Sequence, residues 1–369
     1  MFKKIALVSF SLLAICLLSV PAQALDLTAG LKTGNLELTS AGPISFGPQG
    51  ILFVGDTKAA QVCAIDTGDT KGSPEKAMIR VKGINQVIAG LLGTTGSDIL
   101  INDMAVNPAS GNTYISASSS RGPEAKPVLL RVSTAGKVSI VSLKNVKFST
   151  AKLPNPPAPG GTGRRNLRSQ SITDLAYIDG RLIVAGLSNE EFASTLRAIP
   201  FPFKAVDGGS GVEIFHGAHG RFETRSPVRT FTTYNIDKQP HLLAAYTCTP
   251  LVRFPLQKLK AGSKVKGVTI AELGNRNRPL DMFVYTKGGK DYILMANSAR
   301  GVMKITTDNI GDQEAITKKV ESGKTAGQKY DTIERLKGIV QLDRLNSSHA
   351  VVLVESDGGS VDLSTVELP

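Results

Sequence analysis

The chain has no tryptophan, only three cysteines and four histidines in 369 residues, and aromatic residues make up 5% of it. It also lacks a Gly-x-Ser-x-Gly elbow, a Walker loop, a CxxC pair and a haem-attachment CxxCH motif. These absences exclude the local signatures of serine hydrolases, P-loop nucleotide-binding proteins, dithiol redox proteins and c-type haem proteins. Lysine and arginine are dispersed and never form a run of five.

The first 24 residues have the pattern of a cleaved signal peptide. Two lysines at positions 3 and 4 precede an apolar stretch over 5–20, and the small residues Ala22 and Ala24 suit signal peptidase. The apolar stretch is too short and too early for a membrane span, although a retained anchor is the alternative. We expect cleavage before Leu25, a periplasmic or secreted protein, and no stable membrane span after processing.

The formal net charge of +12 favours anionic partners. An anionic small molecule, an acidic glycan or an acidic protein partner fits this charge, and the alternative is that the charge serves solubility alone. Export argues against a nucleic-acid partner.

A sequence motif that predicts two consecutive strands recurs along the chain. Residues 101–117, 172–185 and 279–296 each contain an apolar strand with an aspartate near its start, a tight turn with glycine, and a second apolar strand. Strand pairs of this kind, repeated at a long period, are typical of a β-propeller. The sequence therefore predicts a single all-β propeller domain over 25–369, after a signal peptide at 1–24.

Four antiparallel strands per blade give a six-bladed β-propeller. The predicted innermost strands are 44–46, 101–106, 172–178, 230–235, 280–285 and 336–341. The predicted fourth strands include 78–81 in blade one and 315–320 in blade five, whereas blade six has only three strands before the chain ends. Residues 34–39 alternate between apolar and polar side chains, as a β-strand does, so we expect this N-terminal strand to complete the last blade and close the ring. Residues 83–98 fit a helical turn, a loop or further strands.

The phrase Asp-Met-Ala-Val-Asn-Pro-x-x-Gly-Asn-x-Tyr-Ile-Ser at 103–116 resembles NHL-type propellers and the gluconolactonase or senescence-marker propellers. The resemblance covers most of the mature chain as architecture. Some relatives of this shape are metal-dependent lactonases and many are binding modules, so the resemblance implies no single chemistry. The absence of tryptophan counts against tryptophan–aspartate repeats and against quinone-cofactor propellers whose blades dock through tryptophan. It does not exclude other quinoprotein designs.

Arginine gathers in the loops that a propeller presents on one face, where functional sites usually lie. The candidate ligand-binding residues are Arg121, Arg164, Arg165, Arg168, Arg276, Arg278, Asn297 and Arg300. A guanidinium fork matches carboxylate or phosphate better than an ammonium does, which predicts an anionic or carbohydrate-like ligand. The alternative is that these side chains hold loop carbonyls.

Three aspartates are candidate metal ligands. Asp103, Asp174 and Asp281 occupy equivalent places in three first strands. Carboxylates that point into the central channel would suit calcium. The alternative is an architectural role, in which each carboxylate accepts backbone N–H groups near its own strand start.

His216 and His219 form the second candidate metal site. They lie in the spacing Glu213-x-x-His216-x-x-His219-x-x-x-Glu223. Imidazole nitrogen suits zinc or copper. The alternatives are a hydrogen-bonded pair or a general base.

Only Cys63 and Cys248 remain after processing. An even pair in an exported protein invites a disulfide. However, the two fall in blades one and four, which lie opposite each other in a sequential six-blade ring, too far apart to bond. We therefore predict two free thiols, with Cys248 at the edge of the active face as a ligand, a nucleophile or an inert residue.

Two functions remain open. The absence of a catalytic motif favours an exported binding or scaffolding protein that holds an anionic ligand or a protein partner on the arginine-rich face. The alternative is a metal-dependent, lactonase-like hydrolase, or an oxidoreductase, with its site at the central funnel and a divalent cation, calcium or zinc, as its cofactor.

Overall fold

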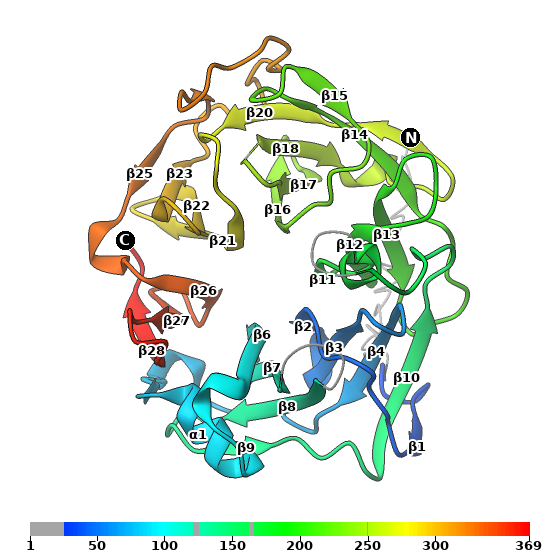
Figure 1. Cartoon of the computed structure of the whole chain (residues 1–369), viewed down its shortest axis with the longest axis vertical. Helices are drawn as coiled ribbons and strands as arrows, with labels where there is room; N and C mark the ends of the chain where they lie inside the picture. Colours follow the sequence, from blue (N-terminus) through cyan, green and yellow to red (C-terminus); the bar gives the residue numbers. More distant parts are fainter. Residues whose placement is uncertain (1–25, 121–124, 162–165, 249) are drawn as a thin grey trace, which may run out of the picture.

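The computed structural model describes residues 26–120, 125–161, 166–248 and 250–369. They form six mainly antiparallel sheets around a common axis, a six-bladed β-propeller (Figure 1). This confirms the predicted fold class and is consistent with an NHL-type or gluconolactonase-like propeller. The predicted signal peptide at 1–24 lies outside the described residues. Within the described ranges, no helix is both long enough and apolar enough to cross a membrane.

The innermost strands of the six blades together surround the central channel. In chain order these strands are β2 (Ile44–Phe46), β6 (Ile99–Val106), β11 (Asp174–Ile178), β16 (Thr230–Ile236), β21 (Pro279–Lys287) and β26 (Ile339–Arg344). The second strand of each blade is buried over most of its length, because both of its faces pack against neighbouring blades. These strands are rich in valine, isoleucine, leucine and alanine, which suit a sheet covered on both sides.

The remaining strands complete the blades as follows. Blade one adds β3 (Ile51–Asp56), β4 (Gln61–Asp66), β10 (Val146–Lys152) and β1 (Lys32–Gly34), and blade two adds β7 (Thr113–Ser119), β8 (Lys126–Val132) and β9 (Val138–Ile140). Blade three adds β12 (Arg181–Leu187), β13 (Ser194–Pro200), β14 (Ser210–His216), β15 (Arg221–Glu223) and the parallel strand β19 (Lys264–Lys266). Blade four adds β17 (Gln239–Ala245), β18 (Pro250–Pro255), β20 (Val268–Glu272) and β24 (Ala326–Gly327). Blade five adds β22 (Lys290–Asn297), β23 (Gly301–Thr306) and β25 (Tyr330–Thr332), and blade six adds β27 (His349–Glu355), β28 (Val361–Glu367) and β5 (Arg80–Val81).

The blades do not follow one another around the ring in chain order. Their innermost strands run β6, β2, β11, β16, β21, β26 around the axis (Figure 1). After blade one the chain passes to the edge of blade six at β5, builds blade two, and then returns to the outer side of blade one as β10. Blade one therefore lies between blades two and three.

The predicted closure of the ring by residues 34–39 is wrong. The strand that completes the last blade is β5, which pairs with β28 at Val81 and Arg80, while β1 pairs with β10. The outer strands predicted at 78–81 for blade one and 315–320 for blade five are also wrong, because β10 and β25 occupy those places. These outer strands are short or distant in the chain, so periodicity alone did not identify their partners. Most of the ambiguous segment 83–98 forms the helix α1 (Ile84–Leu92).

Four aspartates of the innermost strands tie neighbouring blades together. Each accepts the N–H of the residue that follows it and also an N–H from the innermost strand of an adjacent blade. The second set of bonds runs from Ile44 to Asp103 (2.7 Å), from Phe231 to Asp174 (2.7 Å), from Leu342 to Asp281 (3.2 Å) and from Val106 to Asp343 (2.7 Å). The carboxylates thus satisfy backbone donors where two blades meet, rather than only those near their own strand starts.

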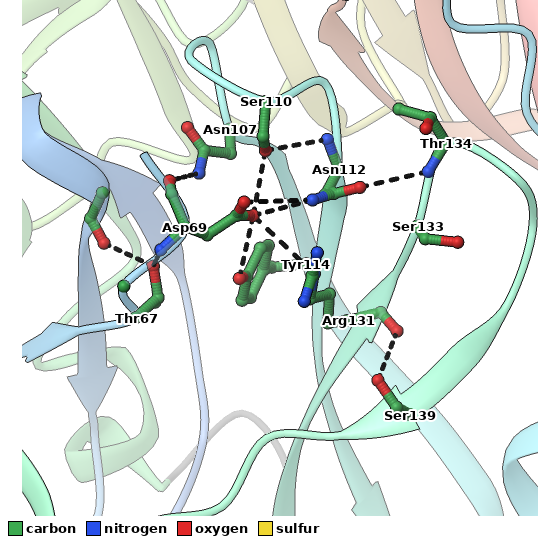
Figure 2. Close-up of polar contacts among 12 residues, drawn as sticks. Thr67, Asp69, Asn107, Ser110, Asn112, Tyr114, Arg131, Ser133, Thr134 and Ser139 are labelled. Atoms are coloured by element: carbon green, nitrogen blue, oxygen red, sulfur yellow. Dashed lines mark hydrogen bonds and ion pairs between the residues drawn. The ribbon is translucent and has the colours of Figure 1, made fainter. Parts of the chain in front are cut away.

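Asp69 anchors blade one to blade two (Figure 2). Its carboxylate accepts hydrogen bonds from Ser110 Oγ (2.9 Å), Asn112 Nδ2 (2.9 Å) and Tyr114 Oη (3.1 Å), and lies 3.7 Å from Arg131 Nε. The Asp69 carbonyl accepts from Asn107 Nδ2 at 2.6 Å. Because Asp69 is buried, these donors replace the water that its charge loses.

Candidate functional site

A hollow of about 940 Å³ lies on the face built by the loops of blades three, four and five. It is lined by Ser169, Gln170, His216, His219, Arg225, Ser226, Pro227, Arg229, Thr247, Cys248, Arg276, Asn277, Arg278 and Ser298. The loops between blades and the loops between second and third strands both contribute, as expected for one face of a propeller. We call this the main hollow.

A tight hairpin places the two histidines side by side. Strands β14 and β15 pair with His216 opposite Arg221, so the turn between them consists of residues 217–220. The N–H groups of His219 and Gly220 both donate to the His216 carbonyl, and Gly220 has a φ of 67° that favours glycine. The imidazole rings of His216 and His219 lie 3.8 Å apart between centroids.

Glu223 orients both imidazoles. Its two carboxylate oxygens lie 3.0 Å from His216 Nδ1 and 2.7 Å from His219 Nδ1, and Ser226 Oγ donates to it at 2.5 Å. Burial alone would raise the pKa of Glu223, but the hydrogen bonds from His216, Ser226 and His219 outweigh it and hold the pKa below its ordinary value. Both Nδ1 atoms are therefore committed to one ionised carboxylate, which leaves the Nε2 atoms for a ligand.

Cys248 approaches the histidines from the turn between β17 and β18. Its φ is 64°, a left-handed conformation that is uncommon for a residue with a side chain. The turn is held in place because the Cys248 N–H donates to the Asn277 carbonyl at 2.9 Å. The loop of blade four that carries Cys248 is thus fastened to the loop that leads into blade five.

The ligand atoms of His216, His219 and Cys248 lie within 4.8 Å of one another. Among the described residues this is the one group of three or more histidine, cysteine or acidic side chains with metal-ligand spacing. The Nε2 atom of His216 is buried and has no hydrogen-bond partner. A buried nitrogen without a partner is costly unless a ligand satisfies it, so the geometry fits a metal ion.

Glu272 packs against the turn at residues 217–220 that carries His219. It is 1% exposed, and its Oε1 accepts the Gly217 N–H at 2.5 Å. A Cβ atom at Gly217 would meet Glu272 Cγ at 2.7 Å, so only glycine allows this close approach. Burial raises the pKa of Glu272 to about 7 despite hydrogen bonds from Gly217 and Ala218.

The rest of the main hollow is positively charged. Arg225, Arg229, Arg276 and Arg278 line it, and its described lining contains no aspartate or glutamate. Arg229 Nε donates to Thr247 Oγ1 at 3.1 Å, which leaves its terminal nitrogens for a ligand. Burial, together with the nearby charge of Arg278, lowers the pKa of Arg229 to about 10. The hollow therefore favours an anion.

The predicted ligand-binding residues divide into three groups. Arg276 and Arg278 line the main hollow. Arg168, Asn297 and Arg300 do not; they hydrogen-bond within the loops, to the carbonyl of Pro157, to Asn277 Oδ1 and to the carbonyl of Asn275, respectively. This is the alternative role that the sequence left open for them. Arg121, Arg164 and Arg165 lie outside the described residues.

The structure brings some of the predicted metal ligands together and assigns the others to hydrogen bonds within the fold. His216 and His219 come together with Glu223, whereas Glu213 of the same spacing lies 3.9 Å from Lys266 Nζ. Asp103, Asp174 and Asp281 are not a group with metal-ligand spacing. One oxygen of each accepts the N–H of the following residue, and the other accepts an N–H from the adjacent blade. Burial raises the pKa of all three.

Arg225 and Arg229 were not among the predicted site residues. A signal for Arg229 existed in the repeat, because it directly precedes the innermost strand β16 as Arg278 directly precedes β21. Cys248 was placed at the edge of this face, but its partners 29 and 32 residues away could not be read from spacing. Cys63 and Cys248 are both free, as predicted. They are not on opposite blades, however, because only blade three separates blades one and four.

No family model and no curated protein matches this chain. Solved structures with a similar fold include a PQQ-bound aldose sugar dehydrogenase from Streptomyces coelicolor, at 12% identity and a TM-score of 0.35, covering 91% of this chain and 96% of that one. An oxidoreductase from Thermus thermophilus, described as a glucose dehydrogenase, aligns at 12% identity and a TM-score of 0.36, covering 91% of this chain and 99% of that one. A streptogramin B lyase aligns at 9% identity and a TM-score of 0.33, covering 92% and 97%. Similarity at this level does not bear on the activity of this chain.

Proposed function

We propose that this chain is a metal-dependent hydrolase that acts on small anionic esters or lactones in the main hollow. The observation that carries the proposal is the convergence of His216, His219 and Cys248 within 4.8 Å beside four arginines. Of the two functions left open by the sequence, this favours the enzyme over the binding or scaffolding protein. The predicted anionic ligand then becomes the substrate.

Two imidazoles and a thiolate suit zinc or copper rather than calcium. The imidazole nitrogens of His216 and His219 and the sulfur of Cys248 would hold the ion. Three protein ligands leave a coordination position for water or substrate, as in catalytic zinc sites. When bound, zinc supplies Lewis acidity and lowers the pKa of a coordinated water.

The chain's own residues have separate tasks in this mechanism. Glu223 holds both imidazoles in the tautomer that presents Nε2, as carboxylates do behind other metal-binding histidines. Arg229 and Arg278 bind the negative charge of the substrate and orient it. Hydrolysis joins the water oxygen to the acyl carbon and breaks the bond to the leaving oxygen, which takes a proton. Nothing is oxidised or reduced.

The test is metal analysis of the purified protein, followed by assay of lactones, carboxylic esters and phosphate esters before and after metal removal. We expect about one zinc per chain, and hydrolysis of anionic esters or lactones that is lost on removal and regained on zinc addition. His216→Ala, His219→Ala and Cys248→Ser should each lose both metal and activity. His241→Ala is the matched control, because His241 does not line the hollow.

A protein that binds no zinc or copper, or that keeps its metal in all three variants, would overturn the proposal. Anion binding by a metal-free protein would instead support the binding protein. We also propose, from the pattern of residues 1–24, that the protein is exported. Mass spectrometry of the protein purified from its host should find a mature N-terminus at Leu25.

A further inference from the structure

A second hollow adjoins the main one. It has a volume of about 400 Å³ and is lined by residues of blades one, two and three together with Arg229 and Arg278, which directly precede β16 and β21. The two hollows share four lining residues, which are Ser169, Gln170, Arg229 and Arg278. The two arginines therefore stand where one hollow meets the other, and a single ligand bound to them could reach into both.

The second hollow differs from the first in its chemistry. Its lining includes the apolar side chains of Ala41, Pro43, Leu100, Pro127 and Ile172. Leu100 is 41% exposed, so its side chain is open to contact with an apolar ligand.

Two polar side chains of the second hollow are engaged within the protein, whereas the buried Oγ1 of Thr173 has no hydrogen-bond partner. Asn102 Nδ2 donates to the Ala41 carbonyl at 2.8 Å, and Ser40 Oγ donates to Asp56 at 2.8 Å. No carboxylate is among its described lining residues, and Lys58 adds one more positive charge. The second hollow thus offers an apolar wall beside a cationic junction.

We propose that the substrate is an elongated organic anion with an apolar arm. Its charged group lies at Arg229 and Arg278, its hydrolysable group faces His216, His219 and Cys248, and its arm packs on Leu100 in the second hollow. This substrate class rests on the proposed hydrolase function for the position of the bond that is cut. The recognition of charge and arm rests on the two hollows alone.

A small inorganic anion would satisfy the arginines but leave the apolar wall of the second hollow exposed to water. Burying that wall against an alkyl or aryl arm contributes about 0.8 kcal/mol per methylene group, which is close to fourfold in affinity. Affinity should therefore rise with arm length until the second hollow is filled.

The experiment is isothermal titration calorimetry of the full-length zinc-supplemented protein with acetate, butyrate and hexanoate, and with uncharged 1-hexanol. We expect affinity to increase by up to about fourfold per added methylene, and 1-hexanol to bind at least tenfold more weakly than hexanoate. Leu100→Ser should remove most of the length dependence and leave acetate binding unchanged. Leu91→Ser is the matched control, since Leu91 is 46% exposed on α1 and lines neither hollow.

Arg229→Gln and Arg278→Gln should weaken binding of all three carboxylates by a similar factor and keep the length dependence. Equal affinity for acetate and hexanoate, or binding of 1-hexanol as tight as that of hexanoate, would overturn the inference. These outcomes are separate from those for the hydrolase. Length-dependent binding by a protein that takes up neither zinc nor copper would overturn the hydrolase function alone. Zinc-dependent hydrolysis without length dependence would overturn the apolar arm alone.

Discussion

The backbone N–H of Cys248 donates to the carbonyl oxygen of Asn277 at 2.9 Å, which joins a proposed metal ligand to the loop that carries Arg278. Asn277 is held in turn by Asn297, whose Nδ2 donates to Asn277 Oδ1 at 3.1 Å. Arg278 is fixed on both sides of its backbone by Ser298. Cys248 and the anion-binding Arg278 therefore share one hydrogen-bonded support.

This relationship predicts that Asn297 positions Cys248. Asn297→Asp keeps the oxygen that accepts the N–H groups of Ala299 and Arg300 but loses the donor to Asn277. We expect zinc affinity, measured by chelator competition, to fall by about tenfold.

The matched control for Asn297→Asp is Asn346→Asp. Asn346 accepts two N–H groups in the turn between β26 and β27 of blade six and donates to the Pro74 carbonyl, away from both hollows. A similar loss of zinc affinity in both variants would show a general effect of the added charge and would contradict the positioning role.

Metal removal should lower thermal stability. Zinc that binds the folded chain through two loops stabilises it in proportion to the logarithm of the free zinc concentration. We expect a lower Tm after dialysis against a chelator, recovery with zinc, and no response to either in Cys248→Ser. An unchanged Tm in the wild-type protein across a thousandfold range of free zinc would contradict this prediction.

The two free thiols should differ in reactivity. Cys63 is fully buried and Cys248 is partly exposed in the main hollow. Burial also raises the pKa of Cys63 to about 12, which keeps it a thiol. Iodoacetamide should label Cys248 but not Cys63 in the native protein, and zinc should slow labelling of Cys248, as measured by peptide mass spectrometry. Labelling of Cys248 at the same rate with and without zinc would argue against its role as a ligand.

The buried aspartates predict that mild acid stabilises the fold. Burial raises the pKa of Asp174 from 3.8 to about 7 and that of Asp343 to about 6, and Glu272 shifts in the same direction to about 7. These groups hold protons in the folded chain at pH values where the unfolded chain has lost them. Stability therefore falls as pH rises through the folded pKa values.

We expect a higher Tm at pH 5.5 than at pH 8, measured by calorimetry in matched ionic strength. Asp174→Asn should reduce the difference, because its side chain no longer titrates. Asp179→Asn, at the exposed turn between β11 and β12, is the control. A Tm that rises from pH 5.5 to pH 8 would show that the hydrogen bonds to these carboxylates outweigh their burial.

The Asp69 network predicts a large effect on stability. Asp69→Ala would leave Ser110, Asn112 and Tyr114 without their buried acceptor and Arg131 without its partner. We expect a loss of about 3 kcal/mol in the free energy of unfolding, measured by urea denaturation. Asp66→Ala, at the end of β4, should cost less than about 1 kcal/mol. Equal effects of the two substitutions would contradict the anchoring role.

The sequence by itself determined the three inner strands of each blade, the number of blades and the face that carries the loops. Alternating apolar strands with glycine turns are local patterns, so the innermost three strands of each blade could be predicted from the chain. The pairing of His216 with His219 was also visible, because both lie in one hairpin turn. The exclusion of a disulfide followed from the distance between blades, although the assumed blade order was wrong.

Only the tertiary structure decided the order of the blades, the closing strand and the composition of the site. Outer strands such as β5 and β10 form backbone hydrogen bonds with the edge of a sheet that is distant in the chain. Any strand of suitable length has the backbone groups needed for such pairing. Likewise, Cys248 meets the histidines only because adjacent blades bring their loops together at one rim. Local periodicity does not predict which sheet edges and which loops become neighbours, because these contacts depend on how all six blades pack around the axis.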